Sequence, residues 1–310
     1  MKQRLFFVLM TLCLILLGQG GFLYAQAPRS LEIGPHVGAS TTLNDINTWK
    51  LFWEPDLEYG ALARLNYDSR WAFRLDYSHS VVKSSDSIAQ WRPERDLSFR
   101  SVINDISLVV EFNFLDYYTG KIGKGVSPYI FGGVSLFWYK TAPNLNKAGQ
   151  QELMGTVNDH NAHAFDSVWN SSLGRNTSFS IPFGIGCKFS ISKHLAASVE
   201  WMMHYTLTDG IDGIANRYPA TNNHQYFVTT QEGYDANNNP IMNYNVVSGS
   251  SADFGPDVIN YMDLTDPTGL FQEGQQRGNS QSMDWFGSLR LSLTWKIPLP
   301  GGTACRIENY

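Results

Sequence analysis

The sequence predicts an all-β fold, a transmembrane antiparallel up-and-down β-barrel of about eight strands with a plugged lumen and long extracellular loops. Three observations lead to this prediction. Eight segments alternate apolar and polar residues, which places successive side chains on opposite faces of a strand. Short and long connections between these segments follow one another in turn. The chain also has few charged residues (16%) and many aromatic ones (14%), as a surface facing lipid requires.

The first 25 residues are expected to be a targeting segment and not part of the fold. Lys2 and Arg4 form a positive n-region, residues 5–17 are an almost wholly apolar run, and Ala25 precedes an expected cleavage site. This pattern is typical of a secretory signal peptide. A membrane-spanning helix needs about 20 apolar residues, so the run is too short to be one. We therefore expect this segment to be removed and the mature chain to begin at Gln26.

Four strands are expected in the N-terminal part of the mature chain. Residues 31–38 and 57–67 carry apolar side chains at nearly every second position. After the turn at residues 68–69, the same alternation continues through residues 71–78, where Trp, Phe, Leu and Tyr face Ala, Arg, Asp and Ser. These two segments form the clearest hairpin in the chain. The fourth strand is expected at residues 106–114.

The other four strands are expected in the C-terminal part. Residues 129–139 are apolar on both faces, so their pattern does not orient them. Residues 179–191 set Phe, Ile and Cys opposite Ser, Gly, Pro and Lys, and residues 195–207 and 285–295 alternate in the same way. The mature chain is thus divided into a barrel at residues 26–297, with a tail at residues 298–310.

Connection length sets the orientation of this barrel. The second and third strands, and the sixth and seventh, are joined by a few residues, and residues 117–127 link the fourth and fifth. The other links are long, at residues 41–55, 80–96, 140–177 and 209–282. Outer-membrane barrels have short periplasmic turns and long extracellular loops. We therefore expect an outer-membrane location, with both termini in the periplasm.

A soluble β-sandwich or lipocalin-like barrel would also alternate, but its apolar face would point into the core. Trp71, Trp201, Trp285 and Trp295 stand near strand ends on the apolar faces. Aromatic residues in these places resemble the girdles of a membrane barrel. This distribution favours apolar faces that contact lipid.

If the apolar faces contact lipid, the charged side chains of the strands point into the lumen. An Arg or Lys at mid-depth on the lipid face would cost about 2–4 kcal/mol. Eight strands enclose only enough room for side chains to fill, so these charges are expected to pair with one another. The expected internal ion-pair network consists of Glu32, Arg64, Arg74, Asp76, Glu111, Lys188, Glu200 and Arg290, with His36, His204 and Lys296 on the same faces. A barrel plugged in this way cannot be a general porin, so its function is expected at its rims.

Charge and motifs exclude several functions. Cleavage of the signal peptide leaves 21 basic against 28 acidic residues, a surface unsuited to nucleic acid. No nucleotide-binding or nucleophile-elbow motif stands in a suitable context, so no cofactor and no catalytic site are expected. The pair His160 and His163 lacks the further ligands that a metal site needs. Residues 208–213 contain two Asp and two Gly but lack the remaining ligands of a calcium loop, so a turn is the better interpretation.

Two features of the mature chain stay open. Cys187 and Cys305 do not make a disulfide framework, and Cys305 in the tail is either an accessible thiol that pairs with another chain or an inert one. The fourth long loop, residues 209–282, is rich in Asn, Gly, Ser and Asp. Such a composition indicates a disordered segment or one that a partner orders.

Five blocks of the sequence carry a family resemblance, at residues 95–101, 110–114, 128–133, 181–188 and 206–209. Together they resemble the PorG family, whose members are outer-membrane barrels of the type IX secretion system in Bacteroidetes. The likeness runs in order from about Leu31 to Trp295, and it departs from the family after Asp209, where an Asn-rich insertion lengthens the fourth loop.

The resemblance implies a non-enzymatic subunit that anchors the periplasmic ring of PorK and PorN to the outer membrane. The residues placed for contact with such partners are Tyr117, Tyr118, Lys121, Lys124, Lys193, His194, Cys305 and Arg306. Two other functions remain open: a surface adhesin or binding barrel that acts through its long loops, and a loop-based outer-membrane acyltransferase or protease. His160, His163 and His224 would be the candidate catalytic residues of such an enzyme.

Overall fold

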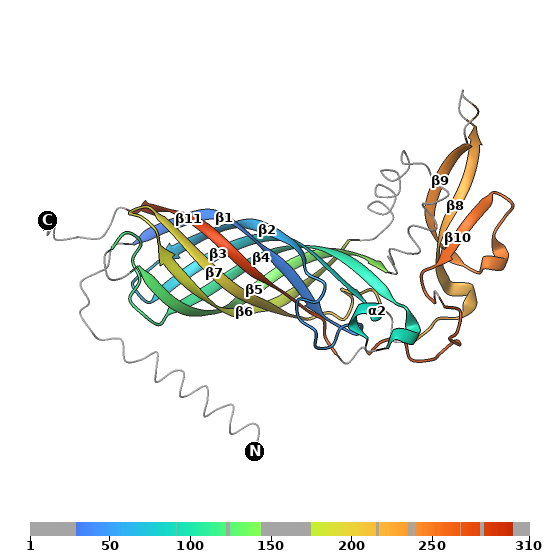
Figure 1. The fold of residues 1–310 in the computed structure, drawn as a ribbon, viewed down its shortest axis with the longest axis horizontal. Coiled ribbons are helices and arrows are strands. Elements are labelled where there is room, and N and C mark those ends of the chain that lie inside the picture. The colour runs from blue at the N-terminus through green and yellow to red at the C-terminus, as the bar shows by residue number, and fades with distance from the viewer. Residues whose placement is uncertain are drawn as a thin grey trace, which may run out of the picture.

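The fold is a closed eight-stranded antiparallel barrel, seen in a computed structural model (Figure 1). The structure describes residues 29–90, 92–121, 125–143, 175–214, 217–234, 238, 240–266, 268–279 and 282–299. The expected signal peptide and all of the tail beyond residue 299 lie outside these residues. No helix in the described part of the chain is long and apolar enough to cross a membrane.

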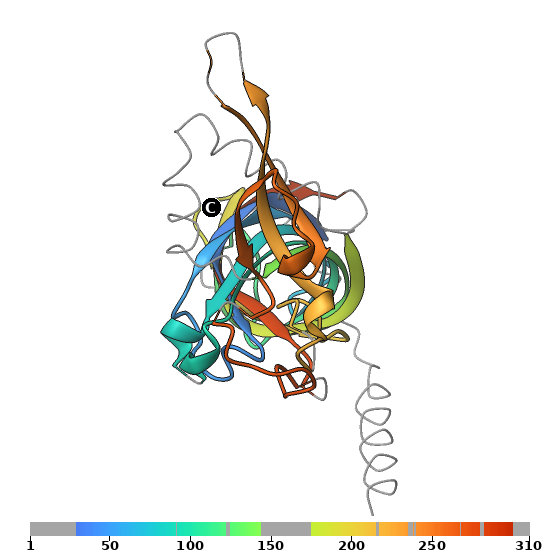
Figure 2. The same ribbon diagram turned by 90° about the vertical axis from the view of Figure 1, so that its right-hand side faces the viewer.

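The barrel strands follow the order β1-β11-β7-β6-β5-β4-β3-β2, and β1 closes the ring by pairing with β2. Figure 2 shows the barrel from the end at which the segment with β8, β9 and β10 lies. Every neighbouring pair is antiparallel. The prediction of an all-β barrel of eight strands is therefore confirmed. The strands are β1 (Ser30–Leu43), β2 (Asp56–Asn66), β3 (Trp71–Ser85), β4 (Ser98–Asn113), β5 (Val126–Pro143), β6 (Asn176–Ser190), β7 (Leu195–Thr206) and β11 (Trp285–Pro298).

The barrel has an apolar outside and a charged inside. On β3, Phe73 and Leu75 are 44% and 54% exposed, whereas Arg74 and Asp76 between them are 0% and 1% exposed. The other strands are arranged in the same way, with exposed Leu, Ile, Val and Phe side chains alternating with buried polar ones. This is the opposite of a soluble protein, in which the apolar side chains are buried. Hydrocarbon is the solvent that such a surface matches, so the barrel spans a membrane.

The structure orients β5, which the alternation of polarity leaves open. Tyr129, Phe131, Phe137 and Tyr139 point inward and are buried, whereas Val134 is 63% exposed on the outside. Period two is kept on this strand, but aromatic side chains take the inner positions. The lumen is thus filled by aromatic rings as well as by charges.

Glycines on β6 make room for these rings. A Cβ at Gly186 would lie 2.7 Å from the Tyr129 ring, and one at Gly184 would lie 2.6 Å from Phe131. The two strands are neighbours, and Gly186 stands opposite Tyr129 in their register. The inward glycines of β6 therefore have a packing role.

The ends of the barrel differ. The turns β2–β3, β4–β5 and β6–β7 lie at one end, together with the start of β1 and the end of β11, where Ser30 pairs with Pro298. We call this the short-turn end and the opposite one the long-loop end. In Figure 1 the short-turn end lies at the left.

A small hydrophobic core closes the long-loop end. Arg95, in the 3-10 helix η1 (Pro93–Arg95), ties three loops together there. Its Nη2 lies 2.7 Å from Asp86 in the short helix α2 (Asp86–Ala89), and its guanidinium donates to the carbonyl oxygens of Asp45 and Arg277 at 3.1 and 2.6 Å. The core beneath consists of Ile46, Val82, Ala89, Leu97, Phe99, Ile103, Phe137, Tyr139, Ile211, Ile214 and Phe286.

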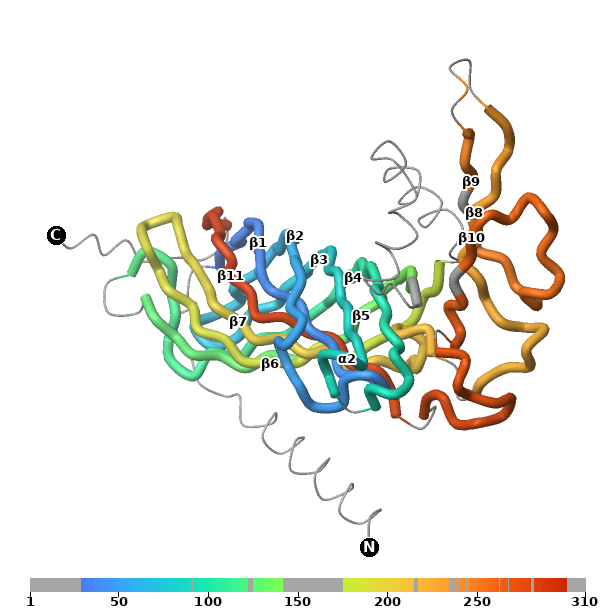
Figure 3. The backbone as a smooth tube through the Cα atoms, turned by 45° about the vertical axis from the view of Figure 1, so that its right-hand side comes forward, coloured from blue at the N-terminus to red at the C-terminus, as the bar shows by residue number. Residues whose placement is uncertain are grey.

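The fourth long loop is folded over most of the residues described, so of its two interpretations the one of a disordered segment is wrong. It carries a three-stranded antiparallel sheet, β10-β8-β9, which lies beyond the long-loop end (Figure 3). Its strands are β8 (His224–Tyr234), β9 (Pro240–Gly249) and β10 (Val258–Asp263), preceded and joined by the 3-10 helices η3 (Thr221–Asn223) and η4 (Ser251–Asp253). An antiparallel bridge between Arg217 and Gln276 forms a neck that brings the two ends of this segment together.

Candidate functional site: the lumen network and the two rims

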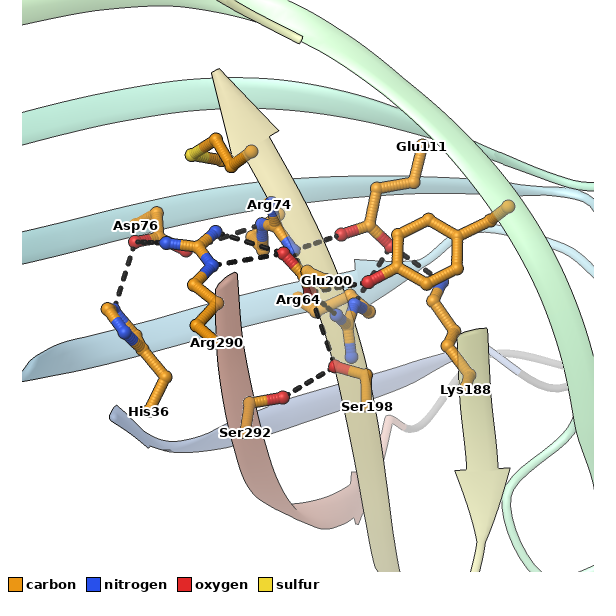
Figure 4. Close-up of polar contacts among 12 residues, drawn as sticks. His36, Arg64, Arg74, Asp76, Glu111, Lys188, Ser198, Glu200, Arg290 and Ser292 are labelled. Carbon is orange, nitrogen blue, oxygen red and sulfur yellow. Dashed lines mark hydrogen bonds and ion pairs between the residues drawn. The ribbon is translucent and has the colours of Figure 1, made fainter. Parts of the chain in front are cut away.

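Glu200 is the centre of the lumen network (Figure 4). Its carboxylate lies 2.6 Å from Arg74 Nη1, 3.0 Å from Arg290 Nη2 and 3.3 Å from Arg64 Nη2. These three arginines come from β3, β11 and β2, and all are at most 2% exposed. The hydroxyl of Tyr129 on β5 donates to the same carboxylate. One acidic side chain thus links strands on opposite sides of the barrel.

Glu111 is a second acidic centre, nearer the short-turn end. Its carboxylate lies 2.6 Å from Lys188 Nζ and 2.9 Å from both Arg64 Nε and Arg74 Nη1. Arg64 also reaches Glu32, at 3.2 Å. Sharing of arginines between the two centres joins them into one network.

Asp76 is a third centre, towards the long-loop end. Arg290 Nη2 lies 3.1 Å from its carboxylate and His36 Nε2 lies 3.2 Å away. Arg290 also reaches Glu58, at 3.5 Å. Glu58 is absent from the network expected from sequence, although it stands between outward Leu57 and Tyr59, so its parity could have placed it there.

The structure thus brings all eight sequence-predicted network residues into one buried cluster. His36 joins them, His204 lies 3.9 Å from Asp105 further along the lumen, and Lys296 lies at the short-turn mouth. Opposite charges nearly balance within the cluster. Burying charges is tolerable only when they are paired, and each charge of this cluster lies within 3.5 Å of an opposite one.

The lumen is blocked at several levels. The network fills its middle, the hydrophobic core fills its long-loop end, and Tyr117 and Thr119 from the β4–β5 connection enter the short-turn end. Tyr117 is 2% exposed, and Thr119 donates a hydrogen bond to Glu32. A barrel occupied at each of these levels is suited to anchoring or binding rather than to conduction.

Tyr117 is therefore placed differently from the other candidate partner contacts. It lies inside the barrel mouth, so its side chain is not available to a partner. Tyr118 is half-buried, with Lys121 Nζ 4.7 Å from its ring centroid. Lys193 and His194 are exposed at the β6–β7 turn, where His194 stacks on Trp295 at 5.5 Å. Lys124, Cys305 and Arg306 lie outside the described residues.

The candidate chemistry of the long loops can be placed in part. His224 lies 2.8 Å from Asp263, between β8 and β10, while His160 and His163 lie outside the described residues. Cys187 is a free cysteine on β6. In the part of the chain that the structure describes, no group of three or more His, Cys, Asp or Glu residues is arranged to hold a metal ion.

A group of aspartates lies beside the hydrophobic core at the long-loop end. Burial, reinforced by the neighbouring carboxylates, raises the pKa of Asp212 to about 7 and that of Asp284 to about 9. Asp284 accepts a hydrogen bond from the Ile211 amide at 2.8 Å, and Asp212 accepts one from Ile214 at 2.9 Å. The Oδ1 atom of Asp284 has no hydrogen-bond partner within the described residues. These aspartates fold residues 208–213 into a turn over the barrel mouth.

Comparisons with known proteins give a family and a set of similar folds. A family model described as a domain of unknown function (DUF6089) matches residues 3–234. No curated protein matches the chain.

Among solved structures, the chain is similar to three bacterial membrane barrels. One is Ail, the attachment invasion locus protein of Yersinia pestis, in complex with the heparin analogue sucrose octasulfate (TM-score 0.36, 9% identity, covering 88% of this chain and 99% of that chain). Another is the N-terminal β-barrel domain of OprF from Pseudomonas aeruginosa (TM-score 0.36, 10% identity, 88% and 99%). The third is Neisserial surface protein A (TM-score 0.36, 9% identity, 87% and 100%).

Proposed function

We propose that this chain, which belongs to the DUF6089 family, is a non-enzymatic outer-membrane subunit that anchors a periplasmic protein ring in a type IX secretion system. The ring would be built of PorK and PorN. The barrel would hold this ring at the membrane without conducting the secreted cargo. The resemblance of the sequence blocks to the PorG family supports this assignment.

The single structural observation that carries the proposal is the closed lumen. Arg64, Arg74 and Arg290 are buried at the centre of the barrel and are bound to carboxylates from several strands. Opening a path would separate these charges and leave them unpaired, which costs several kcal/mol per ion. A subunit of a secretion machine that cannot open in this way fits an anchor better than a conduit.

The proposal assigns the short-turn end to the periplasm. Short turns face the periplasm in outer-membrane barrels, and both ends of the barrel sequence emerge at this end. A partner ring would therefore meet the connections β2–β3, β4–β5 and β6–β7. Lys121, Lys193 and His194 are exposed there.

Co-purification in mild detergent tests the anchor. The full chain carrying an affinity tag after residue 310 would be isolated from cells that contain the type IX machine. We expect PorK and PorN to co-elute and to be lost when the turn residues Lys121, Lys193 and His194 are replaced together. Recovery of a folded barrel free of both ring proteins would contradict the proposal.

The sheet β10-β8-β9 favours a second candidate, a binding barrel that acts at the cell surface. Its outer surface carries Tyr234, Ile241, Ile259 and Tyr261, which are 45–62% exposed. Exposed apolar side chains on a protruding segment are what a binding surface would offer to a partner.

The neck at Arg217 and Gln276 allows a clean distinction between the two functions. Residues 219–273 would be replaced by a short Gly-Ser linker, which leaves the hydrophobic core and residues 208–213 in place. An anchor should keep its ring partners and support secretion after this excision. A surface-binding barrel should lose its function while remaining folded.

A further inference from the structure

A hollow opens at the short-turn end, and its chemistry is that of an anion site. Ser30, Asn66, Tyr118, Lys121 and Lys296 are among the residues that line it. It encloses a volume of about 40 Å³, enough for a carboxylate-sized group but not for a bulky side chain.

The two lysines bring positive charge to this hollow, which Asp68 in its wall and Glu32, opposite Lys296 in the β1–β11 register, offset only in part. Lys296 Nζ donates to the Thr119 carbonyl oxygen at 2.6 Å, and Lys121 Nζ lies 4.7 Å from the Tyr118 ring centroid. Within the described residues, neither lysine makes an ion pair with a carboxylate. The lumen charges differ from them in this respect, because each of those is paired.

One oxygen of the carboxylate in the wall of the hollow is committed to a turn. Asp68 Oδ1 accepts hydrogen bonds from the amides of Arg70 and Trp71, both at 2.7 Å. Arg70 in turn lies 2.9 Å from Asp116. Asp68 therefore lowers the positive potential in the hollow but does not satisfy the lysine ammonium groups.

The place of the hollow indicates where its ligand comes from. Ser30, Asn66, Tyr117 and Thr119, which form part of its wall, are buried residues at the short-turn mouth of the barrel. The hollow therefore belongs to the mouth of the barrel and not to the outer face that contacts lipid. This position favours an acidic segment of a protein over the phosphate of a phospholipid.

We propose that the hollow holds a side-chain carboxylate from an acidic segment of the periplasmic partner, bound between the ammonium groups of Lys121 and Lys296. This inference rests on the proposed function, because it names the chemistry by which the anchored ring is recognised. Ser30 and Asn66 also line the hollow, where the Asn66 amide donates to the Ser30 hydroxyl at 3.2 Å. Charge-assisted bonds of this kind are stronger than neutral ones and depend on salt.

Binding of a labelled decaglutamate peptide to the full chain in detergent tests the site. We expect the double substitution Lys121→Gln and Lys296→Gln to weaken binding at least about tenfold at low salt. Arg100→Gln, at an exposed basic side chain on β4 at the long-loop end, is the matched control and should change affinity less than about twofold. Lys296→Arg keeps the charge and should retain most of the binding that Lys296→Gln loses. Folding of each variant is checked by the gel mobility of unheated samples.

Three results would overturn the site. One is equal weakening by Arg100→Gln, which would show that the peptide follows the overall charge of the chain rather than the hollow. Another is undiminished peptide binding by the folded double variant. The third is binding of phosphatidylglycerol vesicles, but not of the peptide, through the two lysines, which would make the hollow a lipid headgroup site.

The outcome is separable from that of the proposed function. If the wild-type barrel co-purifies with PorK and PorN and the double variant does so equally well, the hollow is not the contact while the anchor role stands. If the peptide binds through the two lysines but no ring protein co-purifies, the site stands and the anchor role falls.

Discussion

Glu200 and Arg290 face each other directly across the β7–β11 strand pair, and their side chains meet in the lumen at 3.0 Å. The pairing register alone brings them together, since both occupy inward positions of neighbouring strands. Arg290 then reaches Asp76 on β3, across the barrel, at 3.1 Å. A local strand pair and a contact across the lumen are thus parts of one network.

Replacing Glu200 by Gln should destabilise the barrel by about 3–5 kcal/mol. The substitution keeps the size of the side chain but leaves three buried guanidinium groups with one carboxylate fewer. The urea midpoint for unfolding in detergent, read from gel mobility, measures the effect. Glu94→Gln, at an exposed side chain in η1, is the control and should leave the midpoint unchanged. A midpoint for Glu200→Gln equal to the control's would show that the network adds little stability.

Placing a charge on the outer face should cost about as much as lipid burial predicts. Leu75→Arg on β3 should destabilise the folded barrel in vesicles by about 2–4 kcal/mol, because the side chain points outward within the apolar band. His79→Arg, four residues further along the same face, lies past that band and should have a much smaller effect. Equal effects at both positions would indicate that Leu75 does not face hydrocarbon.

Adding a methyl group at Gly186 should push against the Tyr129 ring. Gly186→Ala is expected to destabilise the barrel by about 1–3 kcal/mol, since the new Cβ would lie 2.7 Å from that ring. In a Tyr129→Ala background, Gly186→Ala should be nearly neutral. A double-mutant cycle on the free energy of unfolding measures this coupling, and strictly additive effects would contradict the contact.

Stability of the long-loop end should fall as the pH rises from about 4 to 9. Burial raises the pKa of Asp212 to about 7 and of Asp284 to about 9, above the value of 3.8 for an unfolded chain. Between these values the folded state holds protons that the unfolded state releases. The stability of the long-loop end is therefore highest below pH 3.8, and it falls as the pH rises to the pKa values of the folded state. Hydrogen exchange of residues 208–214 at pH 5, 7 and 9 should show faster opening at high pH.

Asp284→Asn is the matching control for this pH effect, because the amide stays neutral throughout. Most of the pH dependence above 7 should disappear in this variant. An unchanged slope between pH 7 and 9 would show that Asp284 does not titrate in that range.

The sequence was sufficient for most of the barrel because period-two polarity records which side chains face lipid. Arg74 and Leu75 differ so strongly in transfer energy that their places are unambiguous. Alternation fails on β5, where Phe131 and Val134 are both apolar although one points inward and the other outward. Only the packing of aromatic rings against the glycines of β6 separates them.

The partner surface and the fourth loop were less predictable, for different reasons. Tyr117 lies in a connection, where no periodicity applies, and its inward turn depends on contacts made by Lys188 and Thr119. In the fourth loop, β8 is short of charges and rich in Tyr, Phe and Val, but the Asn-rich surroundings concealed it. The overall composition of residues 209–282 indicated disorder, whereas the central strand of the sheet, β8, is buried at Tyr226, Phe227 and Val228.

The central claim is that the apolar faces contact hydrocarbon while the charged faces meet inside a closed barrel. Spin labels placed one at a time along residues 71–79 of β3, in a chain with Cys187→Ser and Cys305→Ser reconstituted in vesicles, test it most directly. We predict that collision with oxygen dissolved in the lipid alternates with period two and peaks at residues 73, 75 and 77. Low, non-alternating oxygen collision, or peaks at residues 72, 74 and 76, would contradict the account.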